Sequence, residues 1–138
     1  MRPFAADASV TACWLMPDEM HPIATLTKAS LSHGHALVPR IWWFEIRNVL
    51  VISERRGRRD ARMGDRALGI LRRLPIVLDD NMDEEALLSL ARVYRLTVYD
   101  AAYLELARRE NAPLATLDAM LASAARGANI DLIGEARE

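Results

Sequence analysis

Residues 98–118, VYDAAYLELARRENAPLATLD, contain a helix, a short strand and two acidic residues in close succession. The apolar spacing predicts a helix over residues 100–111, and Pro-Leu-Ala-Thr at residues 113–116 predicts a strand. Asp100 lies at the start of the helix, and Asp118 follows the strand by two residues. Helices that alternate with short apolar strands are typical of α/β domains with a parallel sheet.

The rest of the chain repeats this alternation. Further strands are predicted at residues 4–6, 36–38, 75–78 and 130–133, and further helices at residues 18–33, 41–53, 62–74, 83–94 and 119–127. No internal repeat or linker interrupts the series. The sequence therefore predicts one α/β domain over residues 1–138, with a mainly parallel sheet of five strands.

Composition limits the class of protein. The 138 residues are 51% hydrophobic and 27% charged, with a formal net charge of −1, which is typical of a globular protein without a global basic field. The single cysteine, Cys13, excludes an internal disulfide and a cysteine-rich zinc site. The three histidines do not form a convincing ligand set. No signal peptide and no apolar run long enough to span a bilayer are found, so a cytoplasmic protein is expected.

Four acidic residues stand out by position. Asp7 follows the first strand, and Asp100 and Asp118 begin helices, so each has an ordinary explanation as a turn or cap residue. Asp7 would then cap a short helix over residues 10–15. Glu45 differs, because it lies within a strongly apolar helix, where burial without a partner is costly.

Taken together, the four acids indicate a metal site. Ligands bind at the carboxyl edge of parallel sheets, and carboxylates that cluster there need a cation or protons to offset their repulsion. Oxygen ligands without cysteine or paired histidine favour Mg²⁺ or Mn²⁺. Such an ion can activate water and hold a phosphate for in-line attack.

These residues occur in an order that resembles the PIN domain, and in particular the VapC-type toxin ribonucleases. The segments that carry the resemblance are Asp7-Ala-Ser9-Val10, Glu45-x-x-Asn48, Tyr99-Asp100-Ala-x-Tyr103 and Thr116-x-Asp118. Together they extend over nearly the whole chain. The resemblance implies a three-layer α/β/α sandwich and a metal-dependent endoribonuclease that leaves 5′-phosphate and 3′-hydroxyl ends, with transfer RNA as the default substrate. It also implies a VapB-type antitoxin as partner and a homodimer.

The resemblance also implies roles for individual residues. Asp7 and Asp100 would contact Mg²⁺ or Mn²⁺ directly, whereas Glu45 and Asp118 would act through metal-bound water or on a second ion. Three further residues would support these acids: Ser9 and Thr116 as hydroxyls that orient ligands and water, and Asn48 as a support for Glu45.

Other interpretations stay open. A catalytically inactive PIN fold that serves as a binding or scaffold module is the main alternative. A phosphotransferase of the receiver or haloacid type is disfavoured, because Asp7 has no second acid beside it and Lys28, the only lysine, lies in a predicted helix. The arginine-rich segment 55–66 is either an RNA-backbone clamp or a solvated, partly self-neutralised loop. Of the aromatic run at residues 42–44, at least two side chains are expected in the core.

Overall fold

The computed structural model describes residues 2–135, so Met1 and residues 136–138 of the expected single domain lie outside the described residues. The elements in chain order are β1 (Phe4–Ala6), α1 (Ala8–Leu15), the 3₁₀ turn η1 (Pro17–Glu19), α2 (Pro22–Ser30), β2 (Ala36–Pro39), α3 (Arg40–Arg55), α4 (Ala61–Leu71), β3 (Ile76–Asp79), α5 (Glu84–Tyr94), α6 (Val98–Arg109), β4 (Leu114–Ala115) and α7 (Ala119–Gly127). Within the described part of the chain, no helix is both long and apolar enough to cross a membrane.

The sheet is parallel and has the order β3-β2-β1-β4, which confirms the predicted α/β class. β1 lies inside the sheet, and its three residues are fully buried. Its two alanines leave room for helices to pack closely on both faces. Because β2 and β4 flank β1 on opposite sides, the carboxyl end of β1 is the switch point at which such sheets bind ligands.

The predicted fifth strand at residues 130–133 is reduced to a single bridge between Leu114 and Leu132. Leu114 donates its backbone N–H to Asp131 and accepts one from Ile133. The pairing ends there for two reasons. β4 has only two residues to pair with, and the chain turns at Gly134, which has a φ of 87°.

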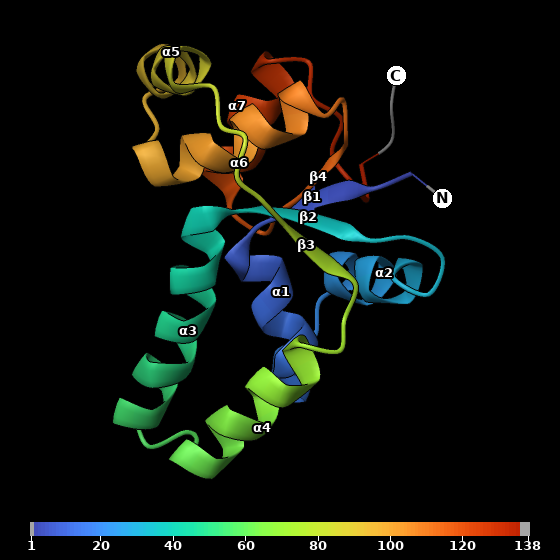
Figure 1. Ribbon diagram of the computed structural model, residues 1–138, viewed down its shortest axis with the longest axis vertical. Coiled ribbons are helices and arrows are strands. Elements are labelled where there is room, and N and C mark those ends of the chain that lie inside the picture. Colours follow the sequence, from blue (N-terminus) through green and yellow to red (C-terminus); the bar gives the residue numbers. More distant parts are fainter. Residues whose placement is uncertain (1, 136–138) are drawn as a thin grey trace.

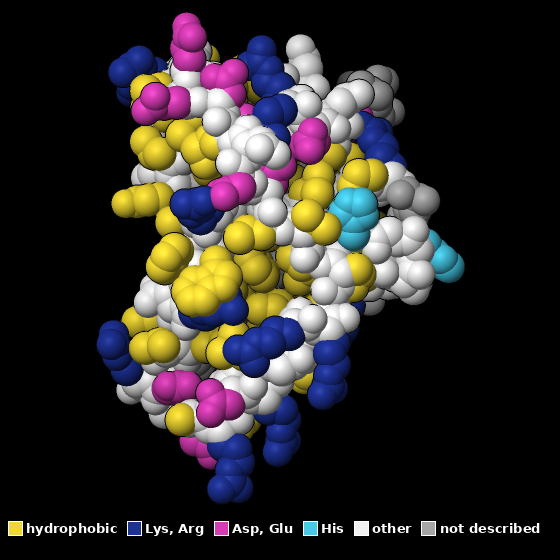
Figure 2. All heavy atoms as spheres, in the orientation of Figure 1, with side chains coloured by type: hydrophobic (Ala, Val, Ile, Leu, Met, Phe, Trp, Pro, Cys, Tyr) yellow, Lys and Arg dark blue, Asp and Glu magenta, His cyan; other side chains and the backbone are white. Residues whose placement is uncertain are grey.

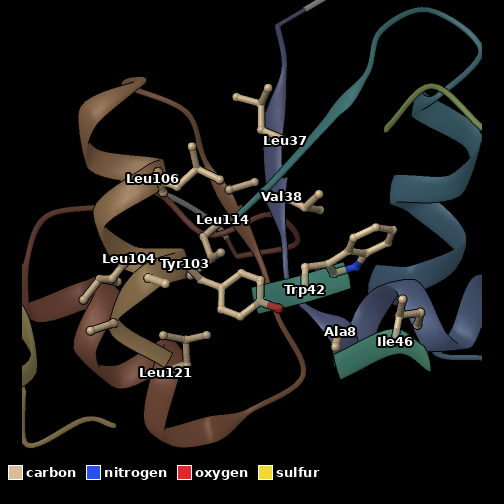
Figure 3. Close-up of a cluster of buried hydrophobic side chains, with 14 of the residues drawn as sticks. Ala8, Leu37, Val38, Trp42, Ile46, Tyr103, Leu104, Leu106, Leu114 and Leu121 are labelled. Carbon is tan, nitrogen blue, oxygen red and sulfur yellow. The ribbon is translucent and has the colours of Figure 1, made fainter. Parts of the chain in front are cut away.

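Helices cover both faces of the sheet (Figure 1): α5, α6 and α7 lie on one side, and α1 and α2 lie on the other. α6 contributes a continuous buried segment from Ala101 to Ala107. Figure 3 shows Tyr103, Leu104 and Leu106 of this helix among side chains from the sheet and α7. The ring of Tyr103 extends toward the first turn of α3, where Trp42 lies.

α3 and α4 form an antiparallel arm that extends away from the sheet, and the arginine-rich turn lies at its tip (Figure 1). Trp42 at the base of this arm is buried, but Trp43 and Phe44 are 43% and 60% exposed. The expectation that two of the three aromatic side chains pack in the core is therefore wrong. Only one of three successive positions on this helix faces the core.

The helix expected over residues 18–33 is divided into η1 and α2. Pro22 has no N–H to continue a helix from the preceding turn, so α2 begins there instead. The N-cap is His21, whose Nδ1 accepts a hydrogen bond of 3.1 Å from the backbone of Ile23. This exposed histidine thus has a local structural role.

Candidate active site

Asp7 follows β1 directly and lies at the switch point of the sheet. It is the N-cap of α1, because its Oδ1 accepts a hydrogen bond of 3.1 Å from the backbone N–H of Val10. Asp7 is nevertheless only 5% exposed, and capping alone does not require burial. The parallel pairing of Ala6 with Ala115 places the next residues, Asp7 and Thr116, side by side.

Two hydroxyl groups hold the Asp7 carboxylate from the ends of α1 and β4. Ser9 donates to Oδ1 at 2.6 Å, and Thr116 donates to Oδ2. Each hydroxyl in turn accepts a backbone N–H from the segment after β4: Leu117 donates to Ser9 and Asp118 donates to Thr116, both at 3.0 Å. The network fixes the carboxylate relative to the start of α7.

Asp118 is the N-cap of α7, and its Oδ1 accepts from the backbone of Met120 and Leu121 at 2.8 and 3.1 Å. The residue is exposed and interacts electrostatically with both Asp7 and Asp100. The Asp118 side chain therefore both caps α7 and lies near the other acids.

Glu45 lies in the first half of α3, half-buried beside the sheet. Its Oε1 accepts a hydrogen bond of 2.5 Å from the hydroxyl of Tyr103, which is 1% exposed. Burial and the charge of Glu45 raise the pKa of Tyr103, so its hydroxyl stays protonated and donates. The costly burial of a glutamate in an apolar helix is thus offset by a partner 58 residues away in the sequence.

Asp100 does not cap α6, contrary to the simplest interpretation of its position. The N-cap is Thr97, whose hydroxyl accepts a hydrogen bond of 3.1 Å from the backbone N–H of Asp100. Asp100 is therefore the third residue of the helix, where a carboxylate is favoured by the helix dipole. Its side chain is partly exposed and is not required as a cap.

The four acids influence one another across the edge of the sheet. Burial raises the pKa of Asp7, and the nearby charge of Asp118 adds to this effect. The pKa of Glu45 is raised by burial and then by the charges of Asp100 and Asp7, and the pKa of Asp100 is raised by burial and by Asp118. The structure thus brings together all four carboxylates that the sequence singled out.

The donor set fits a hard divalent cation in its chemistry, because it consists of carboxylate oxygens with hydroxyls beside them. Among the described residues, no three histidine, cysteine, aspartate or glutamate side chains already converge as a ready metal site. Part of the set is committed to protein hydrogen bonds, to the hydroxyls at Asp7 and to the backbone of α7 at Asp118. Asp7, held by its two hydroxyl partners, and the more exposed Asp100 and Asp118 would hold such a cation.

Supporting contacts differ in part from those expected. Asn48 is exposed, and its proposed support of Glu45 stays a prediction. Two contacts of the site were missed in the sequence. One is the Tyr103 hydroxyl, and the other is Thr11, which accepts from the indole of Trp42 at 2.9 Å and donates to the backbone oxygen of Asp7 at 3.1 Å. The aromatic residue in the Tyr99–Tyr103 motif was the available signal for the first.

Comparisons with known proteins agree with this fold. Among solved structures, the chain resembles PAE2754 from Pyrobaculum aerophilum, with 20% identity, a TM-score of 0.66 and coverage of 89% of this chain and 84% of that one. It also resembles a toxin–antitoxin complex from Klebsiella pneumoniae, with 16% identity, a TM-score of 0.56 and coverage of 83% and 86%. Comparison with curated protein sequences finds no match. Residues 6–133 match the PIN domain family, a match that takes in all four acids and nearly the whole chain, and the protein is therefore a member of the PIN domain family.

Proposed function

We propose that this protein is a metal-dependent endoribonuclease and the toxin of a toxin–antitoxin pair. The observation that carries the proposal is the mutual electrostatic interaction of four carboxylates near the switch point of the sheet, which come from the residue after β1, from α3, from α6 and from the N-cap of α7. Clustered carboxylates with raised pKa values in a PIN fold suit cation-assisted hydrolysis of a phosphodiester. They have no evident use in an inactive binding module.

The residues divide the work of hydrolysis. Asp7 and Asp100 would hold Mg²⁺ or Mn²⁺, and Asp118 and Glu45 would complete its surroundings directly or through water. The ion would supply a Lewis acid for the scissile phosphate and an activated water. Ser9 and Thr116 fix the orientation of Asp7.

The proton balance follows from the contacts of Glu45. Its Oε1 accepts a hydrogen bond from the Tyr103 hydroxyl, and its Oε2 would accept the proton of the attacking water. The water oxygen bonds to phosphorus, the bond from phosphorus to the 3′-oxygen breaks, and that oxygen takes a proton from solvent. The products are a 5′-phosphate and a 3′-hydroxyl. The 2′-hydroxyl is not the nucleophile, so the preference for RNA comes from binding, and transfer RNA is the default substrate.

The partners are a small antitoxin of the VapB type and a second copy of this chain. The fold is similar to that of a protein in a toxin–antitoxin complex. Trp43 and Phe44 at the base of the arm are exposed, and Figure 2 shows a broad apolar area across the middle of one face of the molecule; such exposed apolar surface suits a protein partner.

Incubation of the purified, partner-free protein with total RNA tests the activity. In Mg²⁺ or Mn²⁺ we expect discrete cuts whose downstream fragments carry 5′-phosphates, and chelation should abolish them because the carboxylates alone cannot activate water. Sequencing of the new ends measures this and identifies the RNA. No cuts by folded, metal-loaded protein would favour the inactive-module alternative, whereas cuts that persist in chelator would indicate a contaminant or a different, metal-independent site.

Thermal unfolding at several pH values tests the metal site without activity. Since the pKa values of Asp7, Glu45 and Asp100 are raised in the native state, the native protein binds more protons than the unfolded chain. The metal-free protein should therefore gain stability as the pH falls from the raised values toward about 4, and lose it as the pH rises. A bound cation needs the ionised form and reverses this trend, so Mn²⁺ should raise the Tm more at about pH 8 than at about pH 5. Equal rises at both pH values would argue against the site.

A further inference from the structure

One face of α3 connects the acidic site with the arginine-rich tip of the arm. Glu45, Ile52 and Arg56 share this face, because 7 and 11 residues correspond to about two and three helical turns. At about 1.5 Å per residue, Arg56 lies about 16 Å from Glu45 along the helix axis. The length of α3 thus sets the distance between the arginine-rich tip of the arm and the acidic site.

A hollow of about 260 Å³ lies along this face, between α3 and the end of α1. Its lining includes the apolar side chains of Val49 and Ile52, and Asn48, which follows Glu45 by three residues on α3. Arg56 and Arg58 line its outer end. The hollow therefore leads from the vicinity of Glu45 to two arginines over an apolar surface.

The tip of the arm is positively charged. Arg55, Arg56, Arg62 and Arg66 are exposed and carry no ion pair among the pairs found in residues 2–135. In Figure 2, Lys and Arg side chains outnumber acidic ones at the end of the molecule where α3 meets α4. Arg58 reaches Glu19 at 3.7 Å, but both side chains are largely exposed, so this pair binds only weakly.

Helix stability explains only part of this arrangement. Cations at the end of a helix interact favourably with its dipole, which accounts for Arg55 and Arg56. It does not account for Arg58, which lies beyond the helix, or for the hollow that leads to it.

We propose that this strip, from Asn48 to Arg58, binds the backbone of the RNA strand that flanks the scissile phosphate. This inference rests on the proposed ribonuclease function. Arg56 and Arg58 bind phosphates, and Val49 and Ile52 contact a base or ribose. At about 3.4 Å per stacked nucleotide, the strip reaches about five nucleotides from the site. RNA is favoured over an acidic protein segment, because the strip leads along α3 to the proposed site of phosphodiester hydrolysis, beside which the substrate strand must lie.

The test measures binding without cleavage, so that it is independent of the activity. Fluorescence anisotropy of a labelled 20-nucleotide oligouridine in chelator, over a series of salt concentrations, gives the salt dependence of Kd. Two lost phosphate contacts should reduce the slope of log Kd against log salt by about 1.4 in Arg56→Gln/Arg58→Gln, at about 0.7 per contact with a single strand. Arg56→Lys/Arg58→Lys keeps the charge and should keep most of the slope. Arg92→Gln/Arg108→Gln removes the same charge from α5 and α6 and should leave the slope unchanged.

Glu19→Gln provides a test of opposite sign. Because Glu19 lines the same hollow and pairs with Arg58, its neutralisation should tighten oligouridine binding. The proposal is overturned if wild type does not bind oligouridine, or if the Arg56→Gln/Arg58→Gln slope equals that of wild type. It is also overturned if that variant loses binding to a poly-glutamate peptide but not to RNA, since the strip would then serve an acidic protein. RNA cleavage with an unchanged slope would leave the nuclease standing and remove only this surface.

Discussion

Replacement of Asp7 by asparagine is expected to reduce metal-dependent RNA cleavage by at least about 100-fold, because loss of groups that merely support a metal ligand already costs about 10- to 100-fold. Asparagine keeps the Oδ1 acceptor for the Val10 N–H and nearly the same shape. It removes the negative charge that the cation requires and presents an amide to the Thr116 hydroxyl. The initial rate of cleavage of the RNA identified above measures the effect.

The stability of the same variant distinguishes a catalytic from a structural role. Burial, aided by the charge of Asp118, raises the pKa of Asp7, so its ionised form destabilises the metal-free native state near neutral pH. Asp7→Asn removes this cost and should unfold at the same or a higher temperature in chelator. It should also lose the rise in Tm that Mn²⁺ produces in wild type.

Asp60→Asn is the matched control. Asp60 is the N-cap of α4 and accepts from Met63 at 2.9 Å, as Asp7 does from Val10 in α1, but it is exposed on the arm away from the acidic cluster. Its replacement should leave cleavage unchanged. Equal activity losses in the two variants, or a lower Tm of Asp7→Asn in chelator, would indicate that Asp7 serves only to cap a helix.

The sequence predicted those parts of the site that depend on local pattern and on the geometry of parallel sheets. Asp7 and Thr116 follow two strands that pair in parallel, so their meeting follows once both strands are recognised. Glu45 was marked by its apolar surroundings, because burial of a carboxylate requires a partner. These inferences use the spacing of apolar residues and the free-energy cost of burying a charge, and both can be judged from the sequence.

The errors concern features set by tertiary contacts. The fifth strand depends on the length of β4, which ends after two residues. The N-cap of α6 is Thr97 and not Asp100, because the helix begins earlier than its apolar stripe indicates. The exposure of Trp43 and Phe44 depends on the extension of the α3–α4 arm from the sheet, and no local pattern encodes it. Tyr103, the hydrogen-bond partner of Glu45, is 58 residues away in the sequence, so no local pattern connects the two residues.

A largely buried ion cluster that connects β3, α5 and α6 was also not predicted from the sequence. Glu105 of α6 is 2% exposed and accepts from Arg109 at 2.7 Å, and Arg109 also donates to Asp79 at the end of β3 at 2.8 Å. Glu105 further accepts the backbone N–H of Asp83 at the start of α5, at 3.2 Å. The hydrogen bonds from Arg109 lower the pKa of Asp79, so this pair stabilises the fold above about pH 4 and the stabilisation is lost as the pH falls through the lowered pKa.

Replacement of Arg109 by methionine is therefore expected to lower the free energy of unfolding by about 3 kcal/mol, at the lower end of the range for breaking a buried ion pair. The lower end applies because Arg109 is 25% exposed, so water partly replaces it. Urea unfolding followed by circular dichroism measures the change. Arg108→Met is the matched control, because the neighbouring Arg108 is exposed and its loss should change the free energy by less than about 0.5 kcal/mol.

The double variant Glu105→Gln/Arg109→Met separates the loss of a contact from the presence of an uncompensated charge. If most of the loss in Arg109→Met comes from the buried, unpaired Glu105, its neutralisation should restore part of the stability. If Arg109 acts mainly through Asp79, the double variant should be no more stable than Arg109→Met. A loss in Arg109→Met no greater than that in Arg108→Met would show that the cluster does not hold β3, α5 and α6 together. Because neither Glu105 nor Arg109 forms a hydrogen bond with any of the four acids in the contacts found among the described residues, metal-dependent cleavage by the folded fraction of each variant should stay at the wild-type rate.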